Sequence, residues 1–198
     1  LGICVALAAC SSSSRGGSSG SPAIDTAGGA ELVDQNGRVS IPGAKITYYD
    51  ISGDTEDELR SQLDRKAPVG YDGFKGDATT KWQVKWNWPG YGKASCTLAQ
   101  ADVDYEIEVI MPRWKAPSDA DPALVAKWDR YVEGLAAHEK GHVDNVIKNH
   151  EQVTRAIADA SCSTADGEAQ QALDELREFD VTYDDQTEHG AEQGVRFP

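Results

Sequence analysis

A long stretch of helix-forming residues, from Asp121 to about Ala160, constrains the fold of this chain more than any other feature. Asp121 can cap the first turn, Pro122 suits the first helical position, and no further proline follows within the stretch. Large apolar and aromatic side chains recur on one side at helical spacing, namely Leu124, Trp128, Tyr131 and Leu135. The sequence therefore predicts a long helix with one buried face.

Two earlier segments alternate with the period of a β-strand. In residues 81–88, KWQVKWNW, three tryptophans and a valine alternate with polar side chains, and in residues 102–111, DVDYEIEVIM, apolar residues alternate with acids. This alternation predicts antiparallel strands with one buried and one solvated face, so the acidic row is interpreted as a solvated surface. A shorter strand is expected near residues 46–49, followed by a helix over residues 54–65 that Asp54 can cap.

The C-terminal part completes the expected fold. A last helix is predicted over residues 164–179, and the polar residues from Asp180 onwards are expected to be irregular. Together these elements indicate an α+β fold, in which a small antiparallel sheet packs on the long helix and a second helix follows at the C-terminus. We expect the folded domain over residues 41–198, because the residues before it are small and polar, without periodicity.

The pattern HEKGH, from His138 to His142, lies within the long helix. Residues four apart share one side of a helix, and both histidines fall on or near the apolar stripe, so their imidazoles can meet one ion. Glu139 lies at the edge of the stripe, where a carboxylate can act as a base beside a metal. The pattern predicts Zn²⁺ held by the two histidines, with Glu139 as the catalytic base. The alternative is a pair of core histidines that only hydrogen-bond inside a helix interface.

A catalytic zinc site needs a third protein ligand. His150 follows His142 by eight residues, about 12 Å along a helix, and is therefore too distant. His189, in the polar tail, is the remaining histidine. The alternatives are carboxylates of the last helix: Glu168, Glu175 and Glu178. The spacing alone leaves both possibilities open.

Other residues near these histidines could support the chemistry. Tyr183, six residues before His189, is a candidate oxyanion stabiliser, and Asp144 or Asp185 could orient a ligand imidazole. Gly141 costs the helix about 1 kcal/mol relative to alanine. We expect that its missing side chain lets substrate or another segment of the chain approach the helix.

The first ten residues indicate export. Residues 1–9, LGICVALAA, resemble the end of a secretory signal peptide, in which an apolar run is followed by small residues. The segment LAAC that ends at Cys10 resembles the lipobox of bacterial lipoproteins, where cleavage leaves the cysteine as a lipidated first residue. Cleavage after Ala8 is the alternative. We expect a signal peptide over residues 1–9, and a lipidated Cys10 with a flexible linker over residues 10–40.

The other cysteines predict one disulfide bond. Cys4 would be removed with the signal peptide, which leaves three cysteines. An exported domain readily forms disulfides, so we expect Cys96 to pair with Cys162 and lipid to occupy Cys10. The bond would connect the end of the sheet to the end of the long helix.

The charge of the chain argues against one class of partner. The 33 acidic and 19 basic residues give a net charge of -14, which repels a phosphate backbone, so we expect no nucleic-acid binding. No apolar run reaches the roughly 18 residues that a spanning helix needs. Attachment to a membrane is therefore expected only through lipid on Cys10.

Several of these motifs occur together in one known family. HEKGH in a long helix, two flanking cysteines, the strand KWQVKWNW and the late segment YDDQTEHGAEQG resemble the bacterial domain-of-unknown-function family 922, whose members are regarded as secreted zinc-dependent proteases. The resemblance covers about residues 44–197. It implies that the His-Gly pair of the tail belongs to the site, which favours His189 as the third zinc ligand.

These observations predict an exported, lipid-anchored zinc peptidase of the cell envelope. In it, Glu139 acts as the general base for a zinc-activated water that attacks a peptide bond. The alternative is a non-catalytic envelope module in which a structural zinc pins the tail to the core. A third possibility is another amide hydrolase, such as one that acts on cell-wall peptide.

Overall fold

The computed structural model of this protein describes residues 32–34, 36–70, 73 and 75–197. The expected signal peptide, Cys10 and most of the expected linker lie outside these residues. The elements are, in chain order, β1 (Lys45–Ile51), α1 (Glu56–Lys66), β2 (Thr79–Asn87), β3 (Asp102–Trp114), α2 (Pro122–Asn149), α3 (Glu151–Asp159) and α4 (Ala165–Thr187), with short 3₁₀ turns at Leu98–Gln100 and Ala191–Gln193. The fold is α+β, as the sequence predicts.

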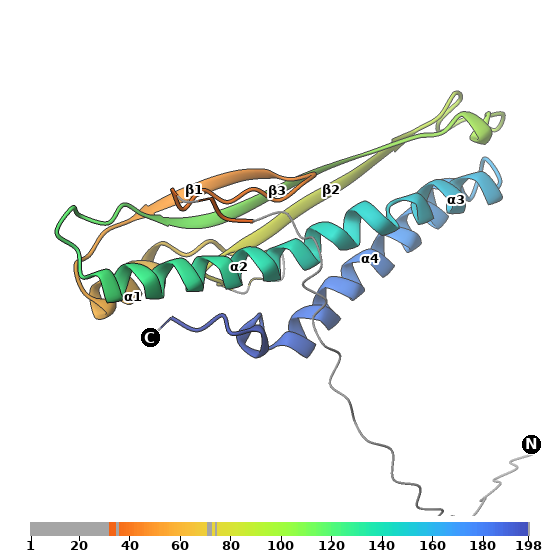
Figure 1. Cartoon of the computed structure of the whole chain (residues 1–198). Coiled ribbons are helices and arrows are strands. Elements are labelled where there is room, and N and C mark those ends of the chain that lie inside the picture. Colours follow the sequence, from red (N-terminus) through yellow and green to blue (C-terminus); the bar gives the residue numbers. More distant parts are fainter. Residues whose placement is uncertain (1–31, 35, 71–72, 74, 198) are drawn as a thin grey trace, which may run out of the picture. The chain divides into compact units, whose positions relative to one another are not determined.

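The sheet has three strands in the order β1-β3-β2 (Figure 1). β2 and β3 form the expected antiparallel pair, whereas β1 runs parallel to β3. The sheet is therefore mixed and not purely antiparallel. A parallel pair needs a long connection, and the segment between β1 and β3, which contains α1 and β2, provides it.

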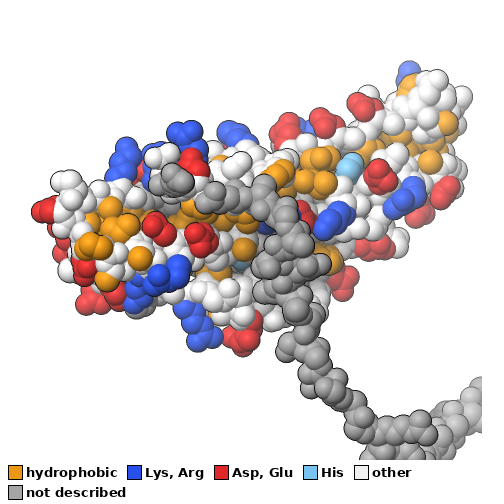
Figure 2. All heavy atoms as spheres, viewed as in Figure 1, with side chains coloured by type: hydrophobic (Ala, Val, Ile, Leu, Met, Phe, Trp, Pro, Cys, Tyr) orange, Lys and Arg blue, Asp and Glu red, His pale blue; other side chains and the backbone are white. Residues whose placement is uncertain are grey.

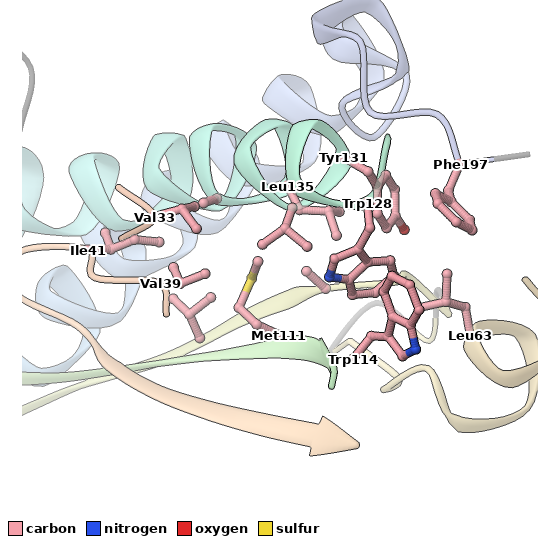
Figure 3. Packing of buried hydrophobic residues seen from close by; sticks show 14 of the residues in the cluster. Val33, Val39, Ile41, Leu63, Met111, Trp114, Trp128, Tyr131, Leu135 and Phe197 are labelled. Atoms are coloured by element: carbon pink, nitrogen blue, oxygen red, sulfur yellow. The ribbon is translucent and has the colours of Figure 1, made fainter. Parts of the chain in front are cut away.

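The helix α2 covers one face of this sheet, and α4 packs against α2 (Figure 1). The apolar stripe of α2 is buried as predicted, with Trp128 and Tyr131 in contact with the side chain of Phe197 near the C-terminus (Figure 3). Val33 and Val39 belong to the same core. The packed region therefore begins before the expected boundary at residue 41.

The outer face of the sheet is polar. The acidic residues of β3 lie opposite β2, where Lys81 pairs in register with Glu108 and Lys85 with Asp104. Lys85 Nζ also lies 3.1 Å from Glu106 Oε1, with both side chains more than half exposed. This supports the interpretation of the acidic row as a solvated surface. In the side view of Figure 2, basic and acidic side chains surround patches of hydrophobic ones.

A second apolar cluster lies between the far end of β2 and the helices α3 and α4. The predicted disulfide between Cys96 and Cys162 is present there, with a Cα–Cα distance of 5.7 Å, and it joins the β2–β3 connection to the α3–α4 connection. It closes a loop with a sequence separation of 66, for which the chain-entropy model gives a stabilisation of about 4 kcal/mol.

Two helices differ from expectation at their ends. The long helix bends at His150, where the side-chain Nδ1 lies 3.0 Å from the carbonyl oxygen of Ile147 and competes for a helical acceptor. Thr55 caps α1 in place of Asp54, since its side chain accepts a hydrogen bond from the Glu58 amide.

None of the helices within the described residues is long and apolar enough to span a membrane.

The larger difference concerns α4, which continues to Thr187. The prediction that the chain is irregular from Asp180 is therefore wrong. Asp180 and Asp184 continue the inward-facing stripe of Leu173 and Leu176, and the histidines of α2 provide partners for both carboxylates. This polar continuation of an apolar stripe places two carboxylates beside the histidines of α2.

Candidate metal centre

His138 and His142 point from α2 towards a single carboxylate on α4. Asp184 Oδ1 lies 3.1 Å from Nε2 of His138 and 3.1 Å from Nε2 of His142. The two histidines are 4% and 7% exposed, and a ligand atom from each of the three residues lies within 4.8 Å of the others. Two imidazole nitrogens and a carboxylate oxygen are a donor set that suits Zn²⁺.

The other ring nitrogen of each histidine also has a partner. Nδ1 of His142 lies 3.1 Å from Asp180 Oδ1, and Nδ1 of His138 lies 2.9 Å from Gln193 Oε1. Because these acceptors favour a proton on Nδ1, Nε2 is the nitrogen of each ring that can bind a metal once it has lost the proton that it shares with Asp184. Asp180 itself accepts hydrogen bonds from Trp82 Nε1, at 2.6 Å, and from Asn145 Nδ2, at 3.0 Å.

The residues proposed from sequence for this orienting role do not fill it. Asp144 is half-buried and accepts hydrogen bonds from Lys140 and Lys148, each one turn away from it along α2. Asp185 is exposed. Helical geometry explains the difference, because Asp180 and Asp184 share one side of α4 whereas Asp185 is rotated by about 100° from Asp184.

In the absence of a metal, the histidines and the neighbouring aspartates shift the pKa values of one another. Burial disfavours protonated His142, but hydrogen bonds to Asp180 and Asp184 outweigh this and raise its pKa to about 10. Burial likewise disfavours ionised Asp184, but hydrogen bonds from the two histidines outweigh it and hold the pKa of this carboxyl well below its usual range. The metal-free cluster therefore favours an ionised Asp184 beside a protonated His142, and a cation that binds there displaces the imidazole protons.

Glu139 is buried beside the cluster, with 3% of its surface exposed. Its Oε2 accepts a hydrogen bond of 2.6 Å from Thr80 Oγ1 on β2, and burial raises the pKa of its carboxyl. A cavity of about 850 Å³ is lined by Glu139 together with His138, His142 and Asp184. A carboxylate with a raised pKa, at the wall of a cavity, is suited to accept a proton.

His189 lies at the same cavity but outside the three-residue group. Its Nδ1 is 3.7 Å from Asp184 Oδ1, and its side chain is 39% exposed. Glu188 and His189 have positive φ values of 48° and 51°, which side chains rarely adopt. Gly190 follows with a φ of 86°, and a Cβ there would lie 3.1 Å from His138 Cγ. The His-Gly pair thus lets the chain pass close to His138, a candidate metal ligand.

The carboxylates that the sequence offered as alternative ligands lie elsewhere. Glu168, Glu175 and Glu178 are exposed on α4. The carboxylate that the described structure brings to the two histidines is Asp184, which was expected to lie beyond the end of the last helix.

Tyr183 packs at the interface of α2 and α4. A Cβ at position 141 would collide with its ring, and its ring stacks on His138 with centroids 5.1 Å apart. Its hydroxyl accepts a hydrogen bond of 3.0 Å from Gln193 Nε2. Tyr183 is absent from the described residues that line the cavity, so an oxyanion role stays a prediction. Gly141 does admit another segment of the chain, as expected, and that segment is α4.

The fold and the site define a class: an α+β protein in which an HExxH helix and a C-terminal helix together hold a His-His-Asp cluster able to bind a metal. Among known families, the bacterial proteins of unknown function designated DUF922 match residues 46–190. The chain belongs to this family. No curated protein and no solved structure matches the chain significantly.

Proposed function

We propose that this protein is a zinc-dependent peptidase whose metal ligands are His138, His142 and Asp184. The observation that carries the proposal is the convergence of two buried Nε2 atoms on one Asp184 oxygen, beside a buried Glu139 at the wall of a cavity. The donor set fits the ion, because neutral imidazoles and an ionised carboxylate are the usual ligands of catalytic zinc. When bound, Zn²⁺ supplies a water of lowered pKa and polarises the scissile carbonyl.

The residues of the chain supply the remaining chemistry. Glu139 accepts the proton of the attacking water and passes it to the leaving amide nitrogen. Thr80 holds the Glu139 carboxylate in place by its hydrogen bond. Asp180 and Gln193 fix the orientation of the two imidazoles.

Substitution Glu139→Gln tests the catalytic part of the proposal. The glutamine side chain has nearly the same shape and keeps an acceptor for Thr80, but it cannot take up a proton. We expect hydrolysis of a reduced, unfolded protein substrate to fall at least about 100-fold, while the variant still binds one zinc per chain. Hydrolysis can be followed by the release of new amino termini and zinc by atomic absorption. Unchanged hydrolysis in this variant would refute the role of Glu139.

The alternative function is a structural metal that fastens α4 to α2. The burial of both histidines favours it, as do the hydrogen bonds that Trp82 and Asn145 donate to Asp180, because they join three elements at one point. If zinc-loaded wild-type protein hydrolyses no peptide while chelation loosens α4, this alternative holds and the peptidase proposal fails. Hydrogen exchange of the α4 amides would measure the loosening.

We also propose that the protein is exported and carries lipid on Cys10. The Cys96–Cys162 disulfide supports this, since such bonds persist in oxidising compartments. Expression of the full precursor with labelled fatty acid should label the wild type and leave Cys10→Ser unlabelled. Equal labelling of both proteins would contradict the anchor.

A further inference from the structure

The strand β2 forms an open edge of the sheet. It has a single neighbour, β3, and runs from Thr79 to Asn87. Within the part of the chain that the structure describes, its backbone hydrogen bonds run to β3 alone. An edge with unpaired N–H and C=O groups is a template on which a further extended chain can pair.

The cavity of the candidate site lies along this edge. Side chains at alternate positions of a strand point to opposite faces. Thr80 and Trp82 face the helices, where they bond to Glu139 and Asp180, whereas Thr79 and Gln83 belong to the opposite face. Residues of both sets line the cavity. A cavity that contacts side chains from both faces of a strand also adjoins the edge of that strand. The backbone N–H and C=O groups of β2 that are unpaired within the described residues lie at this edge.

The same edge leads directly to the proposed catalytic group. Thr80 Oγ1 lies 2.6 Å from Glu139 Oε2, so a chain paired with β2 at this position passes beside the carboxylate. Apolar side chains of several elements complete the cavity wall: Ala78, Leu135, Leu173 and Val181. They can receive apolar side chains of such a chain, while its backbone pairs with the strand.

We propose that the edge of β2, from Thr79 to Val84, binds the substrate as an extended polypeptide through main-chain hydrogen bonds, as in β-augmentation. The proposal rests on the peptidase function, because it assigns the class of substrate to that site. Six residues of strand span about 20 Å. The protein therefore acts on unfolded or extended segments and not on folded helices, with apolar side chains preferred beside Glu139.

Selective backbone methylation of a peptide tests this pairing. The probe is a ten-residue peptide with valine, threonine and leucine in its middle and lysine at both ends, since the protein carries a net charge of -14. Two matched peptides carry N-methyl groups on the even or on the odd middle residues. In a paired strand, only one of these sets donates N–H groups to the partner.

Binding is measured on the zinc-loaded Glu139→Gln variant, which keeps the peptide intact. We expect one methylated peptide to bind at least about ten-fold more weakly than the parent, because two or three hydrogen bonds are lost, and the other to bind within about three-fold of the parent. Equal affinities of the three peptides, or no binding of any at millimolar concentration, would overturn the proposal. An equal loss with both methylated peptides would also overturn it, since it indicates recognition by side chains.

Hydrolysis by the wild type separates this result from the proposed function. If the parent peptide is cleaved but methylation shows no alternation, the peptidase function stands and the β2 pairing fails. If methylation shows the alternation but the zinc-loaded wild type cleaves nothing, the edge binds peptides and the catalytic assignment fails. Slower hydrogen exchange of β2 amides in the presence of the parent peptide would confirm the pairing at Thr79–Val84.

Discussion

Asp184 is the third member of the candidate metal cluster, whereas the sequence predicted His189 as the third ligand. Its Oδ1 is within hydrogen-bonding distance of both candidate ligand imidazoles, whereas His189 Nδ1 lies 3.7 Å from the same oxygen. The sequence predicted His138, Glu139 and His142 because their spacing in a helix has a direct chemical meaning. A single aspartate among 33 acidic residues cannot be identified as a ligand candidate until the helix that carries it, and the face on which it lies, are known. The four-residue spacing of Asp180 and Asp184, in line with Leu176, was the available signal.

Gly141 is predicted to be essential for the close packing of α4 against α2. In an isolated helix, Gly141→Ala would add up to about 1 kcal/mol of stability. In this protein the added Cβ would collide with the Tyr183 ring, so we expect the free energy of unfolding in urea to fall by about 1–3 kcal/mol. Gly167→Ala is a matched control, because position 167 is also helical and a Cβ there meets nothing within 4 Å. A Gly141→Ala protein as stable as the control would contradict the close approach of α4.

At the scale of elements, the site depends on three segments that meet: α2, α4 and β2. Trp82 on β2 donates to Asp180 on α4, which in turn faces His142 on α2. The orientation of one imidazole is thus tied to the sheet through the Asp180 carboxylate. This arrangement gives β2 a role in the proposed metal binding as well as in the proposed recognition of substrate.

Substitution Trp82→Phe tests this link. It keeps an aromatic ring but removes the N–H that donates to Asp180, so we expect zinc affinity to fall several-fold, up to about ten-fold. Trp86→Phe is the matched control, because its Nε1 donates to the exposed Asp166, outside the metal cluster. Competition with a chromophoric chelator measures both affinities. An equal effect of the two substitutions would contradict a role for Trp82 in orienting His142.

Periodicity predicted most of these elements, and the errors have physical causes. The strands alternate and the long helix has one apolar stripe, so local pattern was sufficient there. The parallel pairing of β1 with β3 depends on which strand occupies the centre, which the local pattern does not encode. The end of α4 was predicted too early because polar side chains point inward in its last two turns. Periodicity detects a buried helix face only where that face is apolar.

At the scale of the whole described region, the candidate metal cluster connects two apolar clusters. One is formed by side chains of α1, α2 and the sheet, and the other by side chains of α3, α4 and the far end of β2. The disulfide joins the second cluster to the β2–β3 connection, and the His138-His142-Asp184 group fastens α4 to α2. The zinc ion that we propose for this group would therefore be central to both the chemistry and the packing.

The anomalous scattering of a zinc-loaded crystal tests this central claim most directly. We predict one peak per chain, measured at the zinc absorption edge, about 2.0–2.2 Å from Nε2 of His138, Nε2 of His142 and a carboxylate oxygen of Asp184. His189 should lie beside this site without coordinating the ion. A peak coordinated by His189 in place of Asp184, or no peak between α2 and α4, would contradict the account.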